Sequence, residues 1–217
     1  AKLCYSPADI ETVKDGLDQE KAAGFVDMLA KIGHESPIEH ASFTFGIEGV
    51  SRALLAQITR HRIASYSVQS QRYVKEAQFE FVLPPAIENI PQAKEEFLKA
   101  MEEDQRHYDS LTAILKEAHK KEWLRQGMDE KQAAKKAEKQ AIEDARFVLP
   151  NACCTKMICT FNARRLLNFF SHRCCNRAQW EIQDVAMQML KLCLQAAPAL
   201  FKTAGPPCTR GGCTEGK

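Results

Sequence analysis

Long apolar runs are missing from this chain of 217 residues. No stretch reaches the roughly 18 consecutive apolar residues that indicate a transmembrane helix. The opening residues, Ala1-Lys2-Leu3-Cys4, have neither the charged region nor the apolar core of a secretory signal peptide. We therefore expect a cytoplasmic protein without a membrane partner.

The chain also has little net charge, only +2 at neutral pH. A protein that coats a nucleic acid polymer through bulk positive charge is therefore not expected. Low-complexity tracts, Pro/Gly/Ser-rich linkers and internal repeats are likewise lacking. With 45% hydrophobic residues the chain can bury a substantial core, and we expect one domain over residues 1–205.

Several catalytic and nucleotide-binding motifs are absent. The sequence contains no Gly-x-Ser-x-Gly elbow, no Gly-x-Gly-x-x-Gly turn and no Walker loop. A bound dinucleotide would thus not sit in a Rossmann fold, and no serine or cysteine has the neighbourhood of a nucleophile. Chemistry by charge stabilisation is favoured over covalent catalysis.

Unlike the features above, cysteine is plentiful, with nine residues in the chain. Adjacent pairs such as Cys153-Cys154 and Cys174-Cys175 lack the Cys-x-x-Cys spacing of a compact zinc site, so we expect reduced, buried thiols and no metal. Residues 206–217 form a Cys/Gly-rich segment, expected to be a flexible tail. Alternatively, Cys208 and Cys213 in this segment form a metal site or a redox pair. A structural zinc protein that uses the cysteines is a further alternative.

Hydrophobic periodicity predicts a mixture of helices and short strands. Alternating apolar residues predict strands at 42–48, 77–83 and 155–161. Helical spacing and capping signals predict helices at 51–61, 91–126, 129–146, 163–170 and 179–203. The fold class is therefore α+β and helix-rich.

The segment from Arg60 to Tyr73 carries three arginines, one histidine and three serines with no acidic residue. Arginine offers a planar fork of donors that matches phosphate, and serine hydroxyls complete a phosphate shell. Arg60 and His61, at the start of this segment, fall together with Gln57 at helical spacing. The segment indicates an anion site, so a non-catalytic nucleotide-binding or RNA-binding module using Arg60–Arg72 stays open.

The spacing Arg60-His61-Arg62, seven residues, then Ser70 resembles the signature of the flavin-dependent thymidylate synthases. Further blocks in the family's order begin at His34, Ala145 and Phe161, and the last runs through Arg173 to Gln183. The resemblance extends over about residues 1–205. It implies an α+β fold with one helix-rich domain around an antiparallel sheet.

The resemblance also implies the activity. Members of the family convert dUMP to dTMP with methylenetetrahydrofolate as the one-carbon donor, FAD as the hydride carrier and NADPH as the reductant. They assemble as homotetramers whose sites several subunits share. No enzymic nucleophile attacks the pyrimidine, and Arg173 matches the arginine that polarises the ring.

Other site residues carry over from the family's motifs to matching positions. The expected FAD contacts are Ser36, Glu39, Arg60, His61, Arg62, Asn162, Arg164 and Asn168. The expected dUMP contacts are Gln57, Arg60, Ser70, Gln71, Arg72, Arg146 and Arg173.

Three features depart from the family pattern. Val68 stands where members often have glutamate, so that hydrogen bond is absent or comes from another group such as Gln69. Cys4 stands where other members can have a serine beside the flavin. Members usually carry a further strand before the position of Ala1, so we expect a missing sheet edge and an exposed neighbour.

Overall fold

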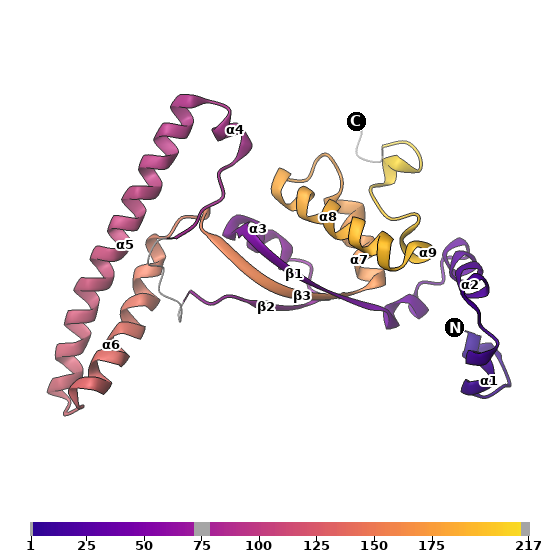
Figure 1. Cartoon of the computed structure of the whole chain (residues 1–217), viewed down its shortest axis with the longest axis horizontal. Coiled ribbons are helices and arrows are strands. Elements are labelled where there is room, and N and C mark those ends of the chain that lie inside the picture. Colours follow the sequence, from indigo (N-terminus) through magenta and orange to yellow (C-terminus); the bar gives the residue numbers. More distant parts are fainter. Residues whose placement is uncertain (1, 72–78, 214–217) are drawn as a thin grey trace. The chain divides into compact units, whose positions relative to one another are not determined.

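The computed structural model describes residues 2–71 and 79–213 (Figure 1). Short 3-10 helices occur at η1 (Lys2–Tyr5), η2 (Ser36–His40), η3 (Arg146–Val148) and η4 (Pro207–Thr209). The α-helices are α1 (Ile10–Asp15), α2 (Gln19–Lys31), α3 (Arg52–Ile58), α4 (Pro85–Glu88), α5 (Pro91–Arg125), α6 (Glu130–Ala145), α7 (Ala163–Arg173), α8 (Trp180–Ala196) and α9 (Pro198–Phe201). Among the described residues, no helix is long and apolar enough to cross a bilayer.

The strands are β1 (Ser42–Ser51), β2 (Ser65–Val68) and β3 (Cys154–Asn162), and they form one antiparallel sheet in the order β1-β3-β2. The central strand β3 alternates along its length, with Thr155, Met157, Cys159 and Phe161 buried. This period of two is what a strand with one covered face requires. The α+β class and the strands predicted at 42–48 and 155–161 are therefore confirmed, although β1 continues to Ser51.

The chain divides into two compact units. The first comprises Ala1–Phe45, Gln57–Tyr66 and Ile158–Lys217, and the second comprises Gly46–Ala56 and Ser67–Met157. The boundaries fall inside β1 and β3, so both units use the same continuous strands. One domain over residues 1–205 stays a prediction.

Helices α7 and α8 carry the core of the first unit. The stripe predicted on α8, Ile182, Val185, Met189 and Cys193, is buried. Pairs of phenylalanine rings, such as Phe170 and Phe201 with centroids 6.0 Å apart, fill the space beside it. The prediction of one helix to residue 203 is wrong, because Pro198 lacks the N–H that an uninterrupted helix needs and instead begins α9.

The long helix pair of the second unit is confirmed almost to the residue. Helices α5 and α6 lie side by side (Figure 1), and Gly127 makes the turn between them with φ of 86°. Asp129 begins α6 by accepting hydrogen bonds from the backbone N–H groups of Lys131 and Gln132. On α5, Leu111 is 36% exposed, whereas Tyr108 is fully buried.

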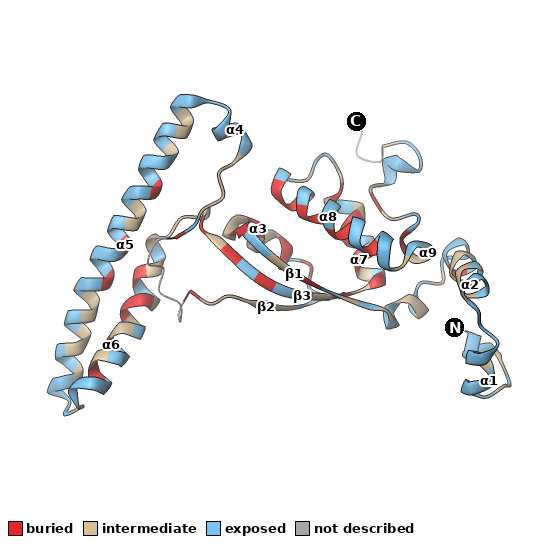
Figure 2. Cartoon of the chain, viewed as in Figure 1, coloured by how far each residue is buried: buried red, intermediate tan, exposed pale blue. Residues whose placement is uncertain are grey.

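Small alanines line the buried side of α6 at every fourth position, namely Ala133, Ala137, Ala141 and Ala145. Figure 2 marks buried positions on both α5 and α6. A row of alanines lets two helix backbones approach closely. The alanine row thus forms the packed side of the hairpin, and Lys131, Lys135 and Lys139 on the other side of α6 are exposed.

Two predicted elements differ from the structure. Helix α3 ends at Ile58 rather than 61, and a turn carries the chain to His61, whose N–H donates to the Ile58 carbonyl. Of the strand predicted at 77–83, residues 77 and 78 lie outside the described residues. The rest contains only an isolated bridge between Phe81 and Cys153, since Pro84 cannot extend a ladder.

All nine cysteines are free thiols. Cys153, Cys159, Cys174 and Cys193 are buried, and burial raises the pKa of Cys174 to about 11. A thiol with so high a pKa stays protonated at neutral pH and is a poor nucleophile. The expectation of reduced cysteines agrees with this state.

Candidate functional site

A basic cavity of about 490 Å³ lies in the first unit. Its basic lining consists of Arg60, Arg165, Arg173 and Arg177 together with the imidazoles of His61 and His172. None of the described residues that line it is acidic. Several arginines in a described lining that contains no acidic side chain favour an anionic ligand in this cavity.

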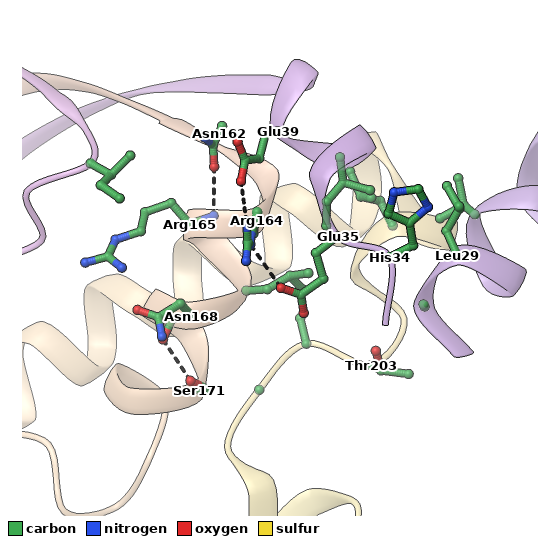
Figure 3. Close-up of a pocket in the computed structure, with 18 of the residues that line it drawn as sticks. Leu29, His34, Glu35, Glu39, Asn162, Arg164, Arg165, Asn168, Ser171 and Thr203 are labelled. Carbon is green, nitrogen blue, oxygen red and sulfur yellow. Dashed lines mark hydrogen bonds and ion pairs between the residues drawn. The ribbon is translucent and has the colours of Figure 1, made fainter. Parts of the chain in front are cut away.

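A second cavity in the same unit, the Arg164 cavity, measures about 670 Å³. Side chains from η2, from α7 and from the segment after α9 line it, and Figure 3 shows their arrangement. Arg165, Asn168 and Ser171 belong to both cavities. Helix α7 therefore lines both spaces.

Asn162 sets the start of α7. Its Oδ1 accepts a hydrogen bond of 2.8 Å from the backbone N–H of Arg165, as the sequence predicted for a helix cap. This bond leaves the Asn162 amide N–H groups as donors. Arg164 and Asn168 follow at positions four apart and line the same cavity, which confirms that they share a face.

Two carboxylates, Glu35 just before η2 and Glu39 within it, hold the Arg164 side chain. Its Nε donates to Glu35 at 3.0 Å, and its Nη1 donates to Glu39 (Figure 3). These hydrogen bonds, first that of Glu39 and then that of Glu35, raise the pKa of the Arg164 guanidinium. Arg164 is thus a guanidinium fixed in direction whose charge is largely offset.

His61 holds Arg173 in a different way. Arg173 Nε donates to His61 Nε2 at 3.1 Å, so this ring nitrogen carries no proton. Burial, and then the charges of Arg173, Arg165 and His172, lower the pKa of His61 from 6.5 to about 4. A neutral acceptor fixes Arg173 without neutralising its charge.

The surroundings of His61 explain its fixed orientation. The residue is 8% exposed, and its ring packs edge-on against Phe169 with centroids 4.8 Å apart. The Tyr66 hydroxyl donates to the carbonyls of His61 and Ile58 at 3.0 and 2.7 Å. Burial raises the pKa of Tyr66 to about 12, so the phenol stays a donor. The Arg-His turn is therefore anchored through both its backbone and its ring.

The structure brings part of the predicted site together. Arg60, His61 and Arg173 share the basic cavity, and Glu39, Asn162, Arg164 and Asn168 share the Arg164 cavity. Ser36 and Arg62 are exposed on η2 and on the loop after His61, and neither lines these two cavities. Gln57 is half-buried, and its amide donates to Gln179 Oε1 at 3.4 Å.

The remaining expected dUMP contacts belong to the second unit, except for Arg72, which lies outside the described residues. Gln71 is buried, and its Nε2 lies 3.4 Å from Cys153 Sγ. Arg146 lies on η3 beside the ring of Phe147. Ser70 is partly exposed on the loop after β2. Their roles stay predictions.

Sequence reasoning missed three basic side chains of this cavity, Arg165, His172 and Arg177, and the carboxylate partner Glu35. The first turn of α7 contains two arginines and no acidic residue. Positive side chains at a helix N-terminus oppose the helix dipole. Unfavourable placement of a positive side chain at a helix N-terminus is therefore the sequence feature that could have identified Arg165 as a site residue.

The cysteine-rich segment contributes to a separate cavity, which Cys174, Cys175, Cys208 and Cys213 line. Within residues 2–71 and 79–213, no three His, Cys, Asp or Glu side chains are arranged to hold a metal ion. The thiols line this space without forming a metal centre there.

The described residues thus form an α+β fold with two cavities that arginine side chains line. Over residues 1–199 the chain matches the family described as "Thymidylate synthase complementing protein". The chain belongs to this family.

Relatives named "Flavin-dependent thymidylate synthase" agree with the assignment. The protein from Clostridium tetani is 53% identical over 216 residues, which cover 100% of this chain and 84% of the relative. The protein from Nitratidesulfovibrio vulgaris is 46% identical over 202 residues, covering 93% of this chain and 76% of the relative. The protein from Geobacter sulfurreducens is 43% identical over 218 residues, covering 100% and 84%.

Proposed function

We propose that this chain catalyses thymidylate synthesis, the reductive methylation of dUMP to dTMP. Its family and the names of its relatives support this reaction. Methylenetetrahydrofolate is the one-carbon donor, FAD the hydride carrier and NADPH the reductant. The active form is a cytoplasmic homotetramer whose subunits share their sites. The observation that carries the proposal is Arg173, a fixed and uncompensated guanidinium in the basic cavity.

The residues of the two cavities fit an anionic dinucleotide such as FAD. The buried Nε of Arg165 has no hydrogen-bond partner among the described residues, and the basic cavity offers cations without acids. Asn162, Arg164 and Asn168 would hold the flavin group, with Glu39 beside them. Arg164 uses only two of an arginine's five N–H donors on Glu35 and Glu39, which leaves donors for a ligand. When bound, the reduced flavin supplies the hydride.

The role of Arg173 is to stabilise negative charge on the pyrimidine. Its Nε is occupied by His61, so its two terminal NH₂ groups can face the ligand. Because the acceptor is neutral, the full positive charge remains for the ring oxygen and nitrogen where electron density accumulates. Arg60 from the same cavity would neutralise the nucleotide phosphate, with Gln57, Ser70, Gln71, Arg72 and Arg146 as further contacts in the oligomer.

The decisive test combines the flavin content and the product of purified protein. We expect a yellow protein that releases FAD on denaturation and forms dTMP from dUMP with methylenetetrahydrofolate and NADPH. Arg173→Ala should keep FAD and its reduction by NADPH but lose about 10²- to 10³-fold in dTMP formation. Arg106→Gln, on the exposed surface of α5, is the matched loss of one charge and should leave the rate unchanged.

Two outcomes would contradict this proposal. A colourless protein that binds RNA in a salt-sensitive manner would favour the non-catalytic binding module. An Arg173→Ala protein that forms dTMP at the wild-type rate would show that the charge of Arg173 does not act on the ring.

A further inference from the structure

Two arginines stand next to each other at the start of α7, and their environments differ. Arg164 has two carboxylate partners, Glu35 and Glu39. Arg165 has no ion pair or side-chain hydrogen bond within the described chain, and its Nε is buried. Figure 3 shows that the Arg165 side chain extends away from the carboxylates that hold Arg164.

The position of Arg165 is costly unless something compensates its charge. The first turn of α7 contains no acidic residue, and the positive end of the helix dipole lies beside the guanidinium. A buried donor without an acceptor also loses its hydration without replacement. Natural sequences keep such local conflicts mainly where function requires them.

The neighbours of Arg165 point to an anion. The guanidinium lines the basic cavity together with Arg60, Arg173 and Arg177, and it also lines the Arg164 cavity. The described lining of the basic cavity offers no carboxylate that could turn toward it. An arginine fork among other cations matches the oxygens of a phosphate group.

We propose that Arg165 binds a phosphate group of a nucleotide ligand at the junction of the two cavities. It is a binding residue beyond those expected from the family's motifs. The proposal rests on the proposed function for the identity of the nucleotide. Two ligands carry such a group, the monoester of dUMP and the diphosphate of FAD, and the same guanidinium can meet either from its place in both cavities.

The test compares each nucleotide with its phosphate-free counterpart on the full chain. Dissociation constants are measured for dUMP and deoxyuridine, and for FAD and riboflavin, with wild type, Arg165→Gln and the control Arg106→Gln. Because Arg165→Gln removes one charge-assisted contact, it should weaken the binding of one phosphorylated ligand by about 10- to 100-fold. Binding of the phosphate-free counterpart should weaken by less than about twofold. If only dUMP binds more weakly, Arg165 contacts the phosphate monoester of dUMP. If only FAD binds more weakly, Arg165 contacts the diphosphate of FAD.

Equal changes for a ligand and its phosphate-free counterpart, or no change relative to Arg106→Gln, would overturn the proposal. If Arg165→Gln does not fold, Arg165→Lys is used for the same measurements. Lysine keeps the positive charge but lacks the paired N–H donors of the guanidinium group. The lysine variant should bind the same phosphorylated ligand more weakly than wild type, by a smaller factor than the glutamine variant. An affinity equal to that of wild type would count against the role of Arg165.

Inorganic pyrophosphate separates this proposal from the proposed function. If wild type binds neither dUMP nor FAD, the proposed function fails, yet pyrophosphate titrated into wild type should still bind more tightly than to Arg165→Gln. If pyrophosphate binds equally to both proteins and nucleotide binding is also unchanged, Arg165 does not form an anion-binding site.

Discussion

Replacement of His61 tests whether a neutral imidazole holds Arg173 in place. His61→Phe keeps a ring that can pack on Phe169 but removes the acceptor of the Arg173 Nε–H. A hydrogen bond to a charged group contributes about 1.5–3 kcal/mol, so a displaced Arg173 should lower dTMP formation by about 10- to 100-fold. His61→Gln supplies a carbonyl oxygen at similar reach, and we expect it to retain most of the rate.

The same pair predicts how the stability of the fold depends on pH. The pKa of His61 is about 4 in the folded chain and 6.5 as its ordinary value, so between these pH values the unfolded chain binds more protons. Stability from this group is complete above pH 6.5 and is lost as pH falls toward 4. At 1.36 kcal/mol per pKa unit the loss is at most about 3 kcal/mol, and solvent screening reduces it.

Urea unfolding of wild type and His61→Gln at a series of pH values from 4 to 7.5 measures this effect. Glutamine does not titrate, so the difference in unfolding free energy between the two proteins should shrink or reverse as the pH falls below 6.5. Parallel curves over the whole range would show that folding does not lower the pKa of His61 and would refute this prediction. This readout does not require catalytic activity, so it stands apart from the proposed reaction.

Three further predictions concern single residues. Arg164→Ala and Asn168→Ala should weaken FAD retention more than dUMP binding, because both line the Arg164 cavity; equal losses in equilibrium dialysis would contradict separate roles. Ser70→Ala should raise the dUMP concentration for half-maximal rate, at a cost of about 1 kcal/mol, and still form dTMP; a Ser70 adduct in mass spectrometry would point to a nucleophile instead. Asp129→Ala should lower the unfolding free energy by about 1 kcal/mol in urea through loss of the α6 cap, with FAD content unchanged.

The elements that the sequence predicted best are those with dense local signals. Pro91, Gly127 and Asp129 mark the ends of α5 and α6, and apolar spacing over more than 15 residues predicts the helices between them. The end of α8 differs from the prediction, because apolar residues continue to 203 whereas the helix ends at Ala196 and α9 begins at Pro198. In this chain the backbone constraint of proline prevailed over side-chain periodicity.

The site was less accessible to sequence reasoning, because its contacts join distant segments. His61 and Arg173 are 112 positions apart, and no local pattern shows that one accepts a hydrogen bond from the other. Resemblance assigned both residues, but it gave His61 to the flavin and did not pair it with Arg173. Arg164 and Arg165 read alike in the sequence, and only the placement of Glu35 and Glu39 separates them.

The two ways of holding an arginine serve different ends. Carboxylates fix Arg164 at the expense of its net charge, which suits a residue that orients a ligand through hydrogen bonds. A neutral imidazole fixes Arg173 and leaves the charge intact, which suits a residue that stabilises charge developing in a reaction. This second arrangement works only while His61 is unprotonated. Burial, and then the charges of Arg173, Arg165 and His172, lower the pKa of His61 to about 4. The burial of the ring and the neighbouring positive charges therefore keep His61 in the state that accepts the hydrogen bond from Arg173.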